Sequence, residues 1–263
     1  MIDRPKVSFW YQLAIQRRVI WALVLREMIT RFGREGIGVI WLVLEPAMFI
    51  LGVVVIFSAI DSAHDGVSMA EYLAVSYPTL LLWRNTSGRV AKALDTNRAL
   101  LHYNPIRPID LLYSRIVLEF AGALISSLVI FLVFVAVGIC HAPDNLLLMV
   151  TGYLMVMWFS FGFVLTLGAL SELSESIERV SHIILYLMLP FTGVFVPAHL
   201  VPPQFRDAFL LTPLINCVEM FHAGYFGDRM QTFYDVPYTM VANLLLTFAG
   251  LVLTNHAIRR VKL

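Results

Sequence analysis

Three carboxylates that lie inside apolar stretches are the residues whose chemistry most needs an explanation. Glu45 lies in the first long apolar run, and Glu119 and Glu219 lie in two later ones. A charged group in hydrocarbon is costly and marks either an ion or substrate pathway or a structural ion pair. For Glu45 we favour a buried ion pair with an arginine of the segment before it. For Glu119 both alternatives stay open. For Glu219 a structural partner, such as an arginine on the outer side, weighs as much as a place on a substrate path.

Basic side chains offer a second chemistry, the binding of anions. Arg84, Arg89, Lys92 and Arg98 follow an apolar stretch and could receive phosphate or carboxylate groups of a cargo. Basic residues also gather on the cytoplasmic side of membrane proteins, and this orienting role accounts for most of them. The candidate substrate path consists of Arg84, Arg89, Lys92 and Glu219.

Catalytic and metal-binding patterns are missing from the sequence. The three lysines, Lys6, Lys92 and Lys262, are followed by Val, Ala and Leu, so no phosphate-binding loop of the type G-x-x-x-x-G-K-[ST] can form. The patterns H-E-x-x-H, G-x-S-x-G and G-x-G-x-x-G are missing as well. The 7 histidines and 2 cysteines show no metal-ligand spacing. We therefore expect no catalytic residue, no metal site and no cofactor in this chain, and no ATP hydrolysis by it.

Composition places these residues in a membrane protein. Of the 263 residues 59% are hydrophobic and 14% are charged, and the mean hydropathy is +0.77. The net charge of +1 gives no sign of a nucleic-acid partner. An α-helix needs about 20 apolar residues to cross the hydrocarbon layer, and six stretches come near that length. They cover residues 37–60, 71–87, 110–140, 146–170, 182–200 and 237–256.

Two of these stretches contain helix breakers. Pro78 lies in the second stretch, and Pro190, Gly193 and Pro197 lie in the fifth. Proline removes a backbone donor and clashes with the preceding turn of a helix. We expect these two spans to be kinked or partly unwound.

Lysine and arginine are distributed unevenly between the connecting segments. Of these 19 residues only Arg206 and Arg229 lie in segments expected on the outer side. Because basic residues stay on the cytoplasmic side, both termini are expected in the cytoplasm. Arg17 and Arg18 interrupt the apolar part of the N-terminal stretch, so we expect no cleaved signal peptide. The predicted fold is all-α, with six transmembrane helices over residues 37–263.

Residues 1–36 precede the first expected span and contain an amphipathic helical pattern. The apolar face consists of Trp10, Ala14, Trp21, Leu25 and Phe32, and the polar face of Gln12, Gln16, Glu27, Arg31 and Arg34. Such a helix lies along the inner leaflet instead of crossing it. The alternative, a basic flank that only orients the chain, stays open, although the pattern is longer than orientation requires.

Two connecting segments have more structure than simple loops need. In the inner loop 89–109, residues 91–101 are good helix formers, and prolines end this helix before the third span. A short surface helix there would be a docking handle, and a solvated loop is the alternative. In the outer segment 201–236, two apolar runs are separated by Thr212 and Pro213, and each is too short to span. We expect them to form a re-entrant helical hairpin that other protein shields from lipid.

Three motifs carry a resemblance to a known family. The first comprises Arg31, Phe32, Gly33, Gly38, Trp41, Glu45 and Pro46, the second is NPIRPID at 104–110, and the third is GVFVP at 193–197 with Arg206, Pro213 and Glu219 after it. With these motifs the sequence resembles the membrane subunits of ABC-2 type polysaccharide exporters, and among them the KpsM-like permeases of capsule export. The resemblance covers nearly the whole chain. One departure is the run 36–38, where the family usually has a bulkier residue.

This resemblance implies an inner-membrane permease that pairs as a homodimer. Two copies of a separate cytoplasmic ATPase would bind ATP and Mg and drive the export of a lipid-linked capsular polysaccharide to the periplasm. There a periplasmic co-polymerase and an outer-membrane exporter would take it over. Residues 94–102 would form the helix that couples the permease to the ATPase. The residues expected at this contact are Leu94, Asp95, Arg98, Leu100 and Leu101.

Three alternatives remain beside capsule export. The first is an ABC-2 permease for another glycan, such as O-antigen or teichoic acid. The second is an ion-coupled secondary carrier that uses Glu45 and Glu119, although the sequence shows no repeat in two halves. The third is a membrane-embedded transferase, which would need a cluster of acid, base or metal residues that the sequence does not present. A neighbouring coding sequence for an ATPase without spans would separate the first from the other two.

Overall fold

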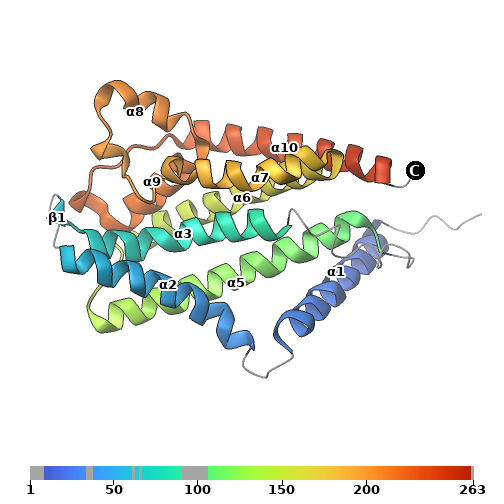
Figure 1. Cartoon of the computed structure of the whole chain (residues 1–263), viewed down its shortest axis with the longest axis horizontal. Helices are drawn as coiled ribbons and strands as arrows, with labels where there is room; N and C mark the ends of the chain where they lie inside the picture. The colour runs from blue at the N-terminus through green and yellow to red at the C-terminus, as the bar shows by residue number, and fades with distance from the viewer. Residues whose placement is uncertain (1–8, 34–37, 61–62, 65–66, 91–105, 262–263) are drawn as a thin grey trace, which may run out of the picture.

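The structure, a computed structural model, is almost entirely helical in the residues that it describes, which are 9–33, 38–60, 63–64, 67–90 and 106–261. Its long helices are α1 (Phe9–Phe32), α2 (Gly38–Ile60), α3 (Met69–Val90), α5 (Pro108–Val137), α6 (Leu146–Leu173) and α10 (Val236–Val261). Strands β1 (Ala63–His64) and β2 (Val67–Ser68) form a small antiparallel pair between α2 and α3. Figure 1 shows α3, α5, α6 and α10 running along the long axis of the molecule, with α1 set at an angle to them. The all-α prediction is confirmed.

Three helices of the described residues are long and apolar enough to cross a membrane. They are residues 108–137, 146–173 and 236–260, and residues 44–56 form a shorter apolar stretch. Continuous helices also occupy the first two predicted spans, as α2 and α3, and α3 runs through Pro78 without a break. The number of membrane crossings stays a prediction.

The fifth predicted span is not one helix. Helix α7 (Glu175–Leu187) ends early and is followed by the 3₁₀ turns η2 (Leu189–Thr192) and η3 (Ala198–Leu200). Between these turns Gly193 has a φ of +74°, which favours glycine. Pro190 and Pro197 lie on either side of it. The expected unwinding at these residues is confirmed.

Polar residues fix the starts of the long helices. Asp110 accepts a hydrogen bond from the backbone of Arg107 at 3.1 Å at the start of α5. Asn145 accepts one from Leu148 at 3.0 Å at the start of α6. Such side chains satisfy backbone N–H groups that the first turn leaves without partners. They explain why the apolar runs become helices with these boundaries.

The polar face of α1 packs against α5. Gln16 donates a hydrogen bond to Asp110 at 3.0 Å, and Arg31 donates one to Glu119 at 2.7 Å farther along both helices. On the other face of α1, Trp10 and Trp21 are exposed. This arrangement suits a helix at the membrane surface, because the tryptophans are available for lipid while the charges are held by protein. The place of α1 relative to the bilayer remains a prediction.

The outer segment contains two short helices, α8 (Pro203–Leu210) and α9 (Pro213–Phe226), followed by the turn η4 (Gly227–Arg229). Each helix begins at a proline, a residue whose fixed φ suits the first helical position. Helix α9 is mostly buried and packs against α6, whereas no residue of α8 is buried. The contact between α6 and α9 is close because Gly152 of α6 faces the backbone of Phe221, and Gly224 of α9 faces that of Met149.

Thiol labelling tests this outer segment. Cys217 on α9 is fully buried, whereas Asp228 in η4 is exposed. We expect Cys217 to resist bulky aqueous thiol reagents in intact cells, and a cysteine introduced by Asp228→Cys to be labelled from outside. Labelling at position 228 only after the cytoplasm is opened would contradict the predicted topology.

Candidate functional site

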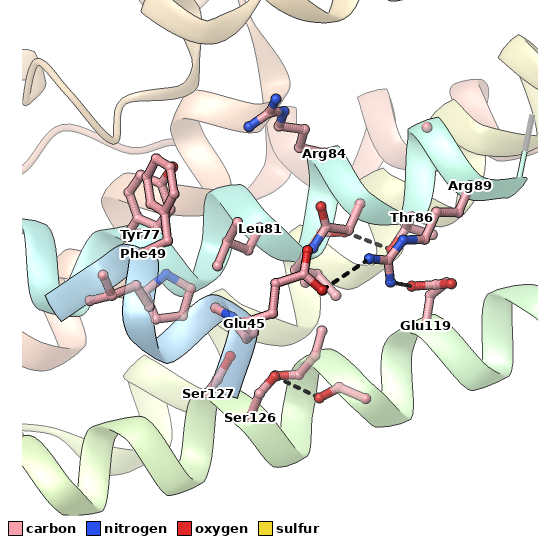
Figure 2. A pocket seen from close by; sticks show the side chains of 18 of the residues that line it. Glu45, Phe49, Tyr77, Leu81, Arg84, Thr86, Arg89, Glu119, Ser126 and Ser127 are labelled. Atoms are coloured by element: carbon pink, nitrogen blue, oxygen red, sulfur yellow. Dashed lines mark hydrogen bonds and ion pairs between the residues drawn. The ribbon is translucent and has the colours of Figure 1, made fainter. Parts of the chain in front are cut away.

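A cavity of about 790 Å³ lies between α2, α3 and α5, with Leu185 and Tyr186 of α7 at its margin. Figure 2 shows its side chains, with Glu45 and Phe49 from α2, Tyr77 to Arg89 from α3, and Glu119 to Ser127 from α5. A concave site lined by a few polar groups among apolar ones is the usual form of a ligand site. This cavity is therefore the candidate functional site.

Ion pairs hold the helices together at one end of the cavity. Glu119 of α5 accepts hydrogen bonds from Arg31 of α1 at 2.7 Å and from Arg89 of α3 at 3.1 Å. Arg115 donates to Glu27 of α1 at 2.8 Å. The side chain of Glu119 is only 6% exposed, so its charge depends on these two arginines for stabilisation. The ion pairs tie α1, α3 and α5 into one unit.

Glu45 does not have the role that the sequence suggested. Its side chain is 71% exposed, and its nearest basic partner is Arg89, at 3.9 Å. The prediction of a buried pair with an arginine of α1 was therefore wrong. One arginine of α1, Arg31, pairs with Glu119, and α1 packs against α5 more extensively than against α2.

Aromatic side chains line the other part of the cavity. The rings of Phe49 and Tyr77 stack with centroids 5.0 Å apart, and Trp41 also lines the wall. Arg84 lies over the ring of Tyr186, 5.2 Å from its centroid, and donates a hydrogen bond to its hydroxyl at 3.2 Å. Flat apolar rings beside hydrogen-bonding groups suit a ligand with both C–H faces and hydroxyl groups, such as a sugar.

Glu219 lies on α9, in the segment expected on the outer side of the membrane, and does not line this cavity. It is fully buried, and its two carboxylate oxygens accept hydrogen bonds from the backbone of Ala198 at 3.0 Å and of Phe233 at 2.9 Å. One turn farther along α9, His222 forms a buried hydrogen bond with Ser76 of α3, with 2.7 Å between Nε2 and Oγ. The hydrogen-bond partners of Glu219 are thus backbone amides, where the sequence suggested an outer arginine.

A second buried acidic residue, Glu71, lies in the first turn of α3. Glu71 accepts hydrogen bonds from Tyr225 at 2.7 Å and Arg229 at 3.1 Å, and its Oε1 lies 3.0 Å from Nδ1 of His141. Burial lowers the pKa of Arg229, but the hydrogen bond and charge of Glu71 outweigh it, so the net shift is upward. Arg229 therefore stays charged at any physiological pH.

The structure brings some of the predicted residues together and leaves others out. Arg84 and Arg89 of the proposed substrate path line the cavity, and so do Arg31, Trp41, Glu45 and Pro46 of the first motif. Phe32 ends α1 and Gly38 begins α2. The predicted coupling residues Leu94, Asp95, Arg98, Leu100 and Leu101, and also Lys92, lie outside the described residues. In the described part of the chain no group of three or more His, Cys, Asp or Glu side chains could hold a metal ion.

Several cavity residues were not predicted as site residues. Tyr77, Tyr186 and Phe49 had no signal beyond their aromatic character.

The spacing of Glu27 and Arg31, four residues apart on a helix, could have indicated a local ion pair, which forms at 3.5 Å. Their partners on α5 are 88 residues away in the chain, and a single sequence gives no sign of such a pairing.

Comparisons with known proteins agree with this architecture. Residues 18–226 match the family model of the ABC-2 type transporter. The chain is 34% identical over 251 residues to the capsule polysaccharide export inner-membrane protein CtrC of Neisseria meningitidis serogroup B, and 32% identical over 252 residues to BexB of Haemophilus influenzae, which has the same description. Each alignment covers 95% of both chains. The polysialic acid transport protein KpsM of Escherichia coli is 25% identical over 91% of this chain and 93% of its own. The family match spans most of the chain, and therefore this protein belongs to the ABC-2 type transporters.

Proposed function

We propose that this chain is the permease subunit of an ATP-driven exporter that moves lipid-linked capsular polysaccharide across the inner membrane to the periplasm. The relatives named for capsule polysaccharide export align over almost their whole length. The observation that carries the proposal is the cavity between α2, α3 and α5, where aromatic walls meet arginine and amide side chains. This lining suits a glycan that presents both apolar faces and anionic or hydroxyl groups.

The proposed assembly rests on the resemblance to capsule exporters and on the missing phosphate-binding loop. A second copy of the chain would line a conduit for a hydrated glycan together with the first. Two copies of a cytoplasmic ATPase would bind ATP and Mg and act on the inner loop through Leu94, Asp95, Arg98, Leu100 and Leu101. Six crossings with both termini in the cytoplasm complete this arrangement, and a periplasmic co-polymerase and an outer-membrane exporter would receive the product.

The described contacts do not favour an ion-coupled carrier. Glu119, one of the two carboxylates that kept that alternative open, is held between Arg31 and Arg89. Each of its two oxygens is engaged by one of these arginines, so neither is free to hold a coupling ion. The deletion experiment described next distinguishes capsular polysaccharide from a different glycan as the cargo of this permease.

Deletion of the coding sequence in its own cell tests the function. We expect surface polysaccharide to disappear and lipid-linked polysaccharide to accumulate in the cytoplasm, because synthesis continues without export. Full-length chain supplied in trans should restore the surface polymer. Normal capsule with loss of a different surface glycan would contradict capsule export and identify another cargo. Unchanged levels of every surface glycan would contradict export altogether.

ATP turnover tests the division of labour between subunits. The purified chain is expected to hydrolyse no ATP, because it has no phosphate-binding loop. Turnover should appear when the partner ATPase is added and should disappear when the catalytic carboxylate of that ATPase is replaced. Hydrolysis by this chain alone, at the rate of the complex, would contradict a purely permease role.

A further inference from the structure

Arg84 differs from the other arginines that line the cavity. Arg31, Arg89 and Arg115 each lie within ion-pair distance of at least one glutamate. Arg84 makes no ion pair with any described residue, and its contacts are with the ring and hydroxyl of Tyr186. Figure 2 shows it apart from the ion pairs that join Glu45, Arg89 and Glu119. Among the described residues, Arg84 is thus the cavity arginine without a counter-charge.

The position of Arg84 makes this arrangement costly. It is half-buried and lies six residues before the last residue of α3, or about 9 Å along the helix axis. An arginine at such a depth in a membrane helix normally pairs with an acidic group or reaches the interface. A ligand anion in the cavity would supply the missing partner. The contact with Tyr186 occupies one N–H group of the guanidinium, and its other N–H groups remain able to bind oxygens of an anion.

Neighbouring groups on α3 extend this site. Tyr77, Leu81 and Arg84 follow one another at helical spacing on one face of α3, and all three line the cavity. Tyr77 itself is buried, and its ring stacks on that of Phe49 of α2, which also lines the cavity. Asn85 lines the cavity as well, and its amide makes no hydrogen bond with any described residue. A cation and an amide with open donors therefore lie along one wall.

We propose that Arg84 is the specificity residue that binds one anionic group of the cargo, a phosphate or a carboxylate, with Asn85 as a second donor. This inference deepens the proposed function of the same cavity and rests on it. Arg89 and Arg115 do not share the role, because glutamates already hold their charges. The selection of anionic over neutral glycolipids is then concentrated in one side chain.

Binding to the full-length chain in nanodiscs tests the proposal with two probes. The first is a synthetic glycolipid with a phosphodiester and neutral sugars, and the second is a lipid-free oligosaccharide of uronic acid. Arg84→Gln should weaken at least one of them about tenfold or more, because a charge-assisted contact to an oxyanion is lost. Arg260→Gln removes an exposed charge outside the cavity and should change neither affinity.

The two probes separate the sources of the anion. Loss of affinity for the phosphodiester probe alone assigns Arg84 to the lipid anchor, and loss for the uronic acid probe alone assigns it to the sugar repeat. Unchanged affinity for both overturns the proposal. If Arg84→Gln fails to fold, Arg84→Lys is used in its place. Its affinity for the probes should fall as the salt concentration rises, because the positive charge is kept. An affinity that does not depend on salt would overturn the proposal. Export in the deletion strain distinguishes failure of the proposed function from failure of the inference about Arg84. If the wild-type chain does not restore capsule, the proposed function is contradicted. If the wild-type chain and Arg84→Gln both restore it equally, only the inference about Arg84 is contradicted.

Discussion

Replacing Gly224 by alanine is expected to separate α9 from α6 and to leave little folded protein. An ideal Cβ on Gly224 would overlap the backbone nitrogen of Met149, and one on Gly152 would overlap that of Phe221. Backbone cannot move aside as a flexible side chain can, so the two helices must move apart. The cost exceeds that of ordinary overpacking, about 1–3 kcal/mol, because the rest of the α6–α9 contact opens as well.

The yield of monodisperse protein and its melting temperature in detergent measure this effect. Gly52→Ala is the matched control, because an added Cβ at Gly52 on α2 meets nothing within 4 Å. The control should purify as wild type does. Equal yield and equal melting temperature for Gly224→Ala and the control would show that the close contact of α6 and α9 is not required.

Glu119→Gln is expected to loosen α1 from the bundle. The substitution keeps the size of the side chain but removes the charge that faces Arg31 and Arg89, so two arginines are left without their shared partner. Breaking a buried ion pair costs about 3 kcal/mol here, at the low end of the usual range, because Arg89 is 39% exposed. Protease sensitivity of α1 and the melting temperature should both report the loss.

Two further variants make this prediction specific. Glu45→Gln changes a carboxylate that is 71% exposed and should cost less than about 0.5 kcal/mol. In the Glu119→Gln background, Arg31→Gln removes one of the two arginines and should restore part of the stability. If the double variant is as unstable as the sum of the two single variants, the ion pair is not the cause of the loss.

Apolar run length and helix breakers were enough to predict most helices. The starts of α6 and α10 and the interruption around Gly193 follow from residues close in sequence, because capping and proline act within one turn. The partner of Glu45 could not be predicted in the same way. Pairing between α1 and α5 depends on how those helices pack, and no local pattern around Arg31 or Glu119 specifies that.

For the candidate site, too, local features could be predicted from the sequence and contacts between distant helices could not. Arg84 and Arg89 were identified because they are basic residues at the end of an apolar stretch, which is a local property. The difference between them, one paired and one not, arises from Glu45 and Glu119 on two other helices. The hydrogen-bond partners of Glu219 could not be predicted for a related reason, since they are backbone amides and any residue type can supply these.

The two hydrogen bonds of Glu219 also constrain the order in which the protein can be made. Its carboxylate binds the amide of Ala198, 21 residues earlier in the chain, and that of Phe233, 14 residues later. During synthesis the earlier partner is present first, and until residue 233 has been made one carboxylate oxygen has only water as a partner. The burial of Glu219 is therefore complete only when the residues directly before α10, which begins at Val236, are in place. A chain truncated before Phe233 would lack the backbone donor to one oxygen of this buried carboxylate.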